Sequence, residues 1–222
     1  MPADFTPATR ARHHPHMQAP QPWPNPSSTR PMSSIAAHAF AGVTTYLCCN
    51  RWRNVESRWA LAPFIALAVA PDLDYIAVWL CNYAADPRFS HSLLFSLGAA
   101  LAVKRVVSTC ATANIGLGWL LTAAMSHALL DFLVAAHSVP LFWPFAEGVT
   151  SPIGVLPSAG SLAAGNVYLW RNLFIELGVL GPAFALLVTV CQRRRWRQIA
   201  FWTLLILPIW IAFVAWSVAL ER

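Results

Sequence analysis

The stretch GLGWLLTAAMSHALLDFLVAA, residues 116–136, decides the fold class of this chain. Its only ionisable side chains are His127 and Asp131, and its length matches the ~20 apolar residues that a helix needs to cross a bilayer. An ionisable group inside a membrane costs roughly 2.5–3.5 kcal/mol on insertion scales unless it is paired, hydrated or bound to a metal. The stretch therefore predicts a membrane-spanning helix whose two ionisable residues have a function.

The whole chain shares this character. Of its 222 residues, 57% are hydrophobic and 11% are charged, whereas a soluble domain carries about 25% charged residues. We predict an all-α, multi-span transmembrane bundle, a single domain over residues 33–222, whose partner is the lipid bilayer. The expected spans, about six in number, are residues 33–49, 59–82, 92–110, 115–136, 169–191 and 199–220.

Residues 1–32 differ in composition. Eight of the 17 prolines fall in the first 31 residues, together with His13, His14 and His16 and few aliphatic residues. Such a segment buries too little apolar surface to offset its ordering entropy, so we predict a disordered tail. The three histidines are interpreted as solvated, with loose metal binding as the alternative.

Basic residues predict an orientation, because short cytoplasmic loops collect Lys and Arg. On one side of the membrane lie Arg51, Arg53 and Arg58 after the first span, Lys104 and Arg105 toward the end of the third, and Arg193, Arg194, Arg195 and Arg197 after the fifth. The opposite side contains only Arg88, Arg171 and Arg222 outside the tail. Both termini are therefore expected to face the periplasm or exterior. The RRRWR run, residues 193–197, is interpreted as a topology determinant rather than a nucleic-acid site.

The ionisable residues in and beside the spans share one depth. Measured along each expected span, they all fall in the outer half of the bilayer, so they can be neighbours in a folded bundle. They are His38, Asp72, Asp74, His91, His127, Asp131 and Glu176. This clustering survives a reversed orientation, because reversal moves every residue together.

The residue types are those of a metal site. His127 and Asp131 are spaced i, i+4, so a helix presents both from one face, as two ligands of one ion require. Asp72 and Asp74 follow Pro71, which we expect to break the helix and let both carboxylates turn inward. Imidazoles and carboxylates together suit Zn²⁺ or Mn²⁺, with room for two or three ions, and an open metal site generates a hydrolytic nucleophile from water. We expect His38, Asp72, Asp74, His91, His127 and Asp131 to be ligands, with Asp74 as an alternative general base.

Other interpretations of these residues stay open. His38 could simply hydrogen-bond a neighbouring helix, and Glu176 could pair with Arg171 instead of binding metal. A non-enzymatic transporter or ion-binding membrane protein could use the same acids as an ion or proton path.

Four motifs resemble the LexA-regulated, membrane-bound metal-dependent hydrolases of bacterial inner membranes. They are SIAAHAF (34–40), APDLDYI (70–76), RFSHSLL (88–94) and SHALLDFL (126–133) followed by VPLFWPF (139–145), and they cover roughly residues 33–147. The resemblance implies an inner-membrane location and a metal-dependent hydrolase with ligands in these motifs.

The chain departs from that pattern twice. Tyr75 stands where the family commonly has a His after PDxD, and Asp86 stands where a first His is expected before the SHS element. Asp86 is therefore a possible additional ligand, as is Glu176. The family is distantly similar to zinc-dependent phospholipases C and single-strand nucleases, which implies a phosphoester substrate.

A long connection follows the fourth span. Phe142, Trp143 and Phe145 lie beside prolines in it and could form an interfacial lid, or could be ordinary headgroup-level aromatics. As a lid they would admit a lipid or lipid-linked phosphate from the side.

Overall fold

The structure is a computed structural model that describes residues 34–49, 58–74, 80, 88–110, 115–134, 138–157, 165–192 and 195–220. The described residues contain six α-helices and no β-strand, only an isolated bridge between Val139 and Val149. The all-α prediction is confirmed for this part of the chain. The predicted tail, the histidines in it, Tyr75 and Asp86 lie outside the described residues.

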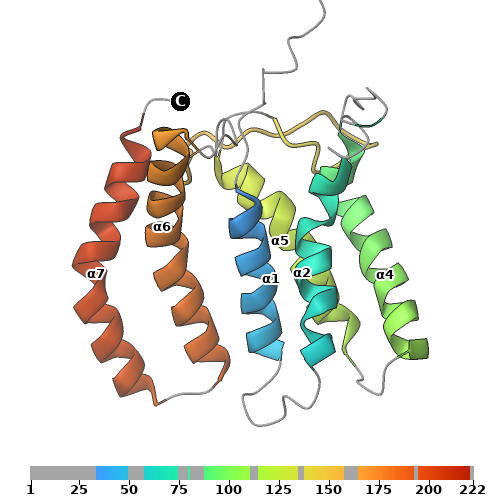
Figure 1. The fold of residues 1–222 in the computed structure, drawn as a ribbon, viewed down its shortest axis with the longest axis horizontal. Helices are drawn as coiled ribbons and strands as arrows, with labels where there is room; N and C mark the ends of the chain where they lie inside the picture. Colours follow the sequence, from blue (N-terminus) through green and yellow to red (C-terminus); the bar gives the residue numbers. More distant parts are fainter. Residues whose placement is uncertain are drawn as a thin grey trace, which may run out of the picture.

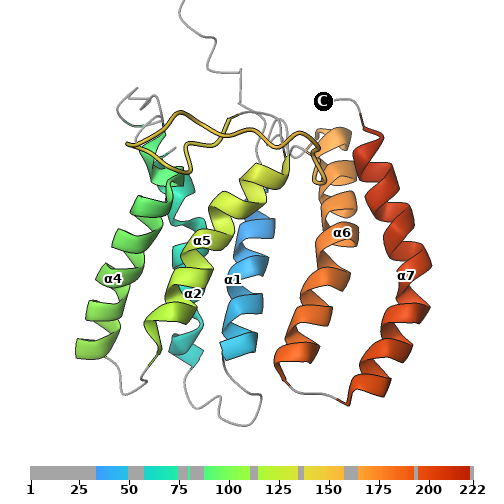
Figure 2. The ribbon, with the colours of Figure 1, turned by 180° about the vertical axis from the view of Figure 1, so that it is seen from behind.

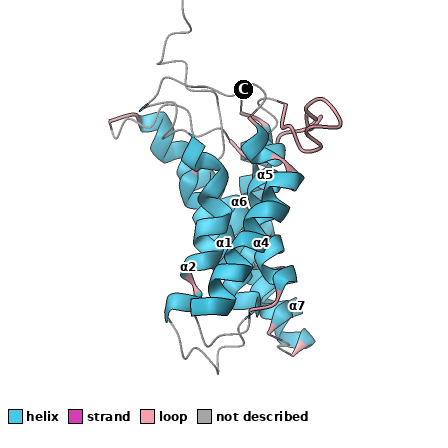
Figure 3. Cartoon of the chain, turned by 90° about the vertical axis from the view of Figure 1, so that its right-hand side faces the viewer, coloured by secondary structure: helices cyan, strands magenta, loops and turns pink. Residues whose placement is uncertain are grey.

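The helices run side by side and alternate in direction (Figure 1). They are α1 (Ile35–Cys49), α2 (Ala62–Val69), α4 (Leu93–Cys110), α5 (Leu117–Val134), α6 (Val167–Cys191) and α7 (Trp196–Val218). Helix α5 lies against α1, α2 and α4, and it passes in front of α2 when the molecule is seen from behind (Figure 2). Helix α6 packs against α1, and α7 packs against α6 at the edge of the row. The described loops gather at the two ends of the helices (Figure 3).

In the described part of the chain, three helices are long and apolar enough to cross a membrane: Leu117–Val134, Val167–Cys191 and Trp196–Val218. Ile35–Cys49 and Ala62–Leu73 are shorter apolar helices, and α4 carries Lys104 and Arg105. The structure thus supports a membrane-spanning helical protein, while the count of six spans stays a prediction.

The expected break at Pro71 is present. Helix α2 ends at Val69 and continues as a 3₁₀ turn, Ala70–Leu73, which contains Pro71 and Asp72. Proline has no backbone N–H and its ring crowds the preceding turn, so the α-helix cannot continue unchanged through it. A second 3₁₀ turn, Phe89–His91, leads into α4.

Small residues allow the helices to approach closely. A Cβ added at Gly42 of α1 would lie 2.7 Å from the carbonyl oxygen of Phe64 in α2. Close approach through small residues is the usual way that helices associate in membranes, where lipid removes most of the hydrophobic driving force.

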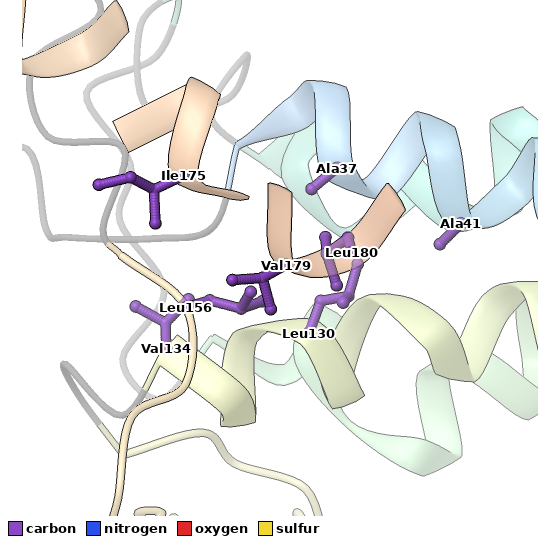
Figure 4. Close-up of a cluster of buried hydrophobic side chains, with 8 residues drawn as sticks. All are labelled: Ala37, Ala41, Leu130, Val134, Leu156, Ile175, Val179 and Leu180. Atoms are coloured by element: carbon purple, nitrogen blue, oxygen red, sulfur yellow. The ribbon is translucent and has the colours of Figure 1, made fainter. Parts of the chain in front are cut away.

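A buried apolar cluster joins α6 to the rest of the bundle (Figure 4). It is formed by side chains from α1, α5 and α6 and one from the loop before α6: Ala37, Ala41, Leu130, Val134, Leu156, Ile175, Val179 and Leu180. This cluster fixes α1 against α5 on the side that faces α6.

Candidate metal centre

Five ionisable side chains from four elements converge at one end of the bundle. They are His38 of α1, Asp72 of the first 3₁₀ turn, His91 of the second, and His127 and Asp131 of α5. All five residues are buried, the most exposed being Asp72 at 5%. They form two overlapping groups that could each hold a metal ion: His38, His127 and Asp131, and Asp72, His91 and His127.

The two carboxylates face the three imidazoles. Oxygens of Asp131 lie 3.5 Å from Nε2 of His38 and 3.3 Å from Nε2 of both His91 and His127. Oxygens of Asp72 lie 3.9, 3.8 and 3.7 Å from the same three nitrogens. The ring of His127 stacks on that of His38, with centroids 3.8 Å apart, and meets that of His91 edge to face. The Nε2 atoms of all three histidines therefore face the same two carboxylates, His38 through one oxygen of each and His91 and His127 through the other.

The backbone determines which nitrogen of His127 carries the proton. Its Nδ1 lies 2.8 Å from the carbonyl oxygen of Ala68, which can only accept a hydrogen bond. Nδ1 must therefore donate, and in the neutral ring Nε2 presents a lone pair. Metal-binding histidines are commonly oriented in this way by a carbonyl on the other nitrogen.

A lone pair facing carboxylate oxygens requires a positive species between them. Nε2 of His127, Nε2 of His91 and both carboxylate oxygens of Asp72 are buried and have no hydrogen-bond partner among the residues that the structure describes. The distances between the imidazole nitrogens and the carboxylate oxygens, 3.3–3.9 Å, exceed the roughly 2.7–2.9 Å of a charge-assisted hydrogen bond. This disfavours a protonated imidazole bonded directly to a carboxylate. Donors about 2.1 Å from a tetrahedral zinc ion lie about 3.4 Å from one another. The donor set therefore fits a shared divalent ion.

Asp74 differs from the expectation that it turns inward with Asp72. Its carboxylate accepts hydrogen bonds from Arg88, through Nη2 at 2.5 Å and Nε at 2.8 Å, and from the hydroxyl of Ser90 at 2.8 Å. The 3₁₀ turn places Asp72 in the cluster, while Asp74, at the end of the turn, faces Arg88. In this geometry Asp74 belongs to neither group of candidate ligands.

Sequence reasoning missed the role of Arg88. The sequence analysis uses Arg88 only to orient the chain, whereas in the structure its guanidinium pairs with Asp74 and lies 3.9 Å from Asp72. A signal was present, because Arg88 is the only Lys or Arg between Arg58 and Lys104.

Glu176 also lies outside both groups. It is buried in α6 and accepts hydrogen bonds from the backbone N–H of Ser34, at 3.2 Å, and from the Ser34 hydroxyl. The same Ser34 oxygen accepts from the N–H of Ala37 at 3.1 Å, as an N-cap does. Arg171 instead donates to Asn172 and lies over the ring of Tyr168. Glu176 thus secures the start of α1, one turn before His38.

The aromatic loop lies beside the second 3₁₀ turn. The N–H of Leu93 donates to the carbonyl of Leu141 at 2.9 Å, and the ring of Trp143 lies 5.7 Å from that of Phe89. Phe142 and Phe145 are exposed, the latter by 87%. The loop is therefore fixed close to His91, and its function as a lid stays a prediction.

The comparisons with known proteins agree with the membrane interpretation. The sequence matches the YdjM inner membrane protein family over residues 32–220, so the chain belongs to that family and to the bacterial inner membrane. No curated protein and no solved structure matches it.

Proposed function

We propose that this member of the YdjM inner membrane protein family is a metal-dependent hydrolase. In this proposal His38, Asp72, His91, His127 and Asp131 hold a divalent ion, zinc or manganese. One observation carries the proposal: buried imidazole nitrogens and carboxylate oxygens face one another at 3.3–3.9 Å, and Asp72, His91 and His127 present atoms there that form no hydrogen bond within the described part of the chain.

The charges of the site support a divalent cation. Asp72 and Asp131 supply two negative charges, and neutral imidazoles add none, so a doubly charged ion leaves the buried cluster neutral. Buried charges persist in proteins when they are paired or coordinate metals. When bound with an open position, such an ion supplies a hydrolytic nucleophile by acidifying water.

Arg88 favours an anionic substrate. Its guanidinium lies 3.9 Å from an Asp72 oxygen, beside the cluster, and its side chain is 16% exposed. Arginine is well suited to binding phosphate groups through its planar fork. Together with the resemblance to phosphoester-cleaving enzymes, this supports a phosphoester substrate, and the exposed aromatics beside His91 favour one carried by a lipid.

The arrangement of the helices supports a periplasmic site. The site lies where α1 and α4 begin and α5 ends. At the opposite ends, α1 leads into a connection that contains Arg51, Arg53 and Arg58, and α4 carries Lys104 and Arg105 in its last two turns. The positive-inside rule assigns this side to the cytoplasm.

Reconstituted protein tests the proposal. Wild type in lipid nanodiscs, loaded with zinc or manganese, is incubated with phosphoester lipids and soluble aryl phosphoesters, beside His91→Ala and the control Ser96→Ala. Ser96 is also buried, but within the described residues its hydroxyl bonds only the backbone carbonyls of Ser92 and Ala124, so its variant should retain activity. Product from wild type and Ser96→Ala, absent with His91→Ala, is the expected result.

The same protein in sealed vesicles tests the competing transport function. Metal or proton flux that His91→Ala abolishes, without hydrolysis of any phosphoester, would replace the hydrolase with a transporter.

A further inference from the structure

His91 lies at the end of a chain of polar side chains that reaches out of the cluster. Its Nδ1 lies 3.0 Å from the hydroxyl oxygen of Ser90, which lies 2.8 Å from Oδ2 of Asp74. Asp74 in turn accepts two hydrogen bonds from Arg88. The side chains of Asp74 and Arg88 are 26% and 16% exposed, whereas that of His91 is 2% exposed.

The hydrogen-bond donors in this chain follow from its chemistry. A carboxylate only accepts, so the single proton of the Ser90 hydroxyl goes to Asp74. The Ser90 oxygen is then left with lone pairs toward His91, and Nδ1 of His91 must donate to it. In the neutral ring this leaves the lone pair on Nε2, the atom that lies 3.3 Å from Asp131 and 3.8 Å from Asp72.

Arg88 holds Asp74 in position for this role. Its two hydrogen bonds engage both carboxylate oxygens, and bidentate Arg–carboxylate pairs fix geometry as well as adding energy. Asp74 also directly follows the first 3₁₀ turn, two residues after Asp72. The position of the turn is thereby coupled to the second turn, which carries Ser90 and His91.

We propose that Asp74 and Ser90 are positioning residues of the metal centre. Asp74 acts through the Ser90 hydroxyl to orient the His91 ring and keep its proton on Nδ1, so that Nε2 faces the ion, and Arg88 fixes Asp74. This inference rests on the proposed metal centre. It gives Asp74 a role outside the ligand set, and it contrasts with His127, which the backbone carbonyl of Ala68 orients directly.

Metal affinity and a spectrum test the inference without any substrate. Zinc dissociation constants are measured by chelator competition on full-length protein in detergent, with His13, His14 and His16 replaced by Ala to remove tail binding. Ser90→Ala and Asp74→Asn are compared with Ser90→Thr, which keeps the hydroxyl, and with Ser96→Ala. The visible spectrum of each Co²⁺-loaded variant reports the ligand field at the ion.

Ser90→Ala and Asp74→Asn should weaken zinc binding by about 10–100-fold, the usual effect of losing an outer hydrogen bond to a ligand. Their Co²⁺ spectra should change, while Ser90→Thr and Ser96→Ala match wild type. If both variants bind zinc as wild type does with unchanged spectra, the positioning role is wrong and the metal centre stands. If wild type itself binds no zinc, the metal centre and this inference fall together.

Discussion

Helices α5 and α7 are both long and apolar, but only α5 is built into the interior. Eight residues of α5 are buried, among them His127 and Asp131, whereas Ser217 is the only buried residue of α7. Helix α5 packs against α1, α2 and α4, while α7 packs against α6. A long apolar helix therefore indicates a membrane span, whereas buried ionisable residues indicate which spans form the site.

Helix α7 is held in place by side-chain hydrogen bonds to backbone carbonyls rather than by buried ionisable residues. The indole N–H of Trp210 donates to the carbonyl of Val179 at 2.9 Å, close to Pro182, which interrupts the hydrogen bonds of α6. The Ser217 hydroxyl donates to the carbonyl of Val155 at 2.6 Å. These contacts hold helices in place, and changes to them should leave metal binding intact.

The largest effect is expected from a change in the candidate metal centre on α5. Asp131→Asn removes a carboxylate that lies within 3.5 Å of Nε2 of His38 and within 3.3 Å of Nε2 of His91 and His127. A ligand at about a thousand times its Kd stabilises the folded protein by about 4 kcal/mol, so zinc should raise the Tm of wild type and leave that of Asp131→Asn nearly unchanged. Thermal unfolding in detergent with and without zinc measures this. Ser217→Ala, in α7, is the control and should keep the rise in Tm that zinc produces. Loss of that rise in Ser217→Ala would contradict the distinction between α5 and α7.

The next largest effect is expected on stability, from a steric clash with the backbone. Gly42→Ala places a Cβ 2.7 Å from the Phe64 carbonyl oxygen, which cannot move aside as a side chain can. We expect a loss of about 1–3 kcal/mol, typical of overpacking. A weaker zinc response should accompany it, because α1 carries His38.

Gly98→Ala is the matched control for this change. Apart from the backbone of α4 itself, no described atom lies within 4 Å of a Cβ added at Gly98, so alanine should be neutral or stabilise by up to about 1 kcal/mol. Equal melting temperatures for the two alanine variants would show that α1 and α2 are not packed as closely as described.

The smallest effect is expected in the α6–α7 pair. Trp210→Phe removes the hydrogen bond to Val179 and keeps an aromatic ring, so it should cost about 0.5–1.5 kcal/mol of stability. Zinc affinity should equal that of wild type, by the same chelator competition. A reduced affinity would mean that this pair contributes to the site after all.

Much of the site was predictable because its spacing is local. The i, i+4 pair of His127 and Asp131 and the break at Pro71 follow from helix geometry and proline chemistry within a few residues. The gathering of His38, Asp72 and His91 with that pair followed from counting each residue's depth along alternating spans.

The rest depends on partners that are far apart in the sequence. Which of Asp72 and Asp74 faces the cluster is decided by Arg88, 14 residues after Asp74. The role of Glu176 depends on Ser34, 142 residues before it. No local pattern contains either contact, so the sequence alone left both acids as candidate ligands.

Elemental analysis of purified full-length protein tests the central claim most directly. Wild type and His127→Ala/Asp131→Ala are compared in detergent, both with His13, His14 and His16 replaced by Ala. The account predicts near-stoichiometric zinc or manganese in wild type and its loss in a double variant that stays folded. A folded wild-type protein that retains no divalent metal after reloading would contradict it.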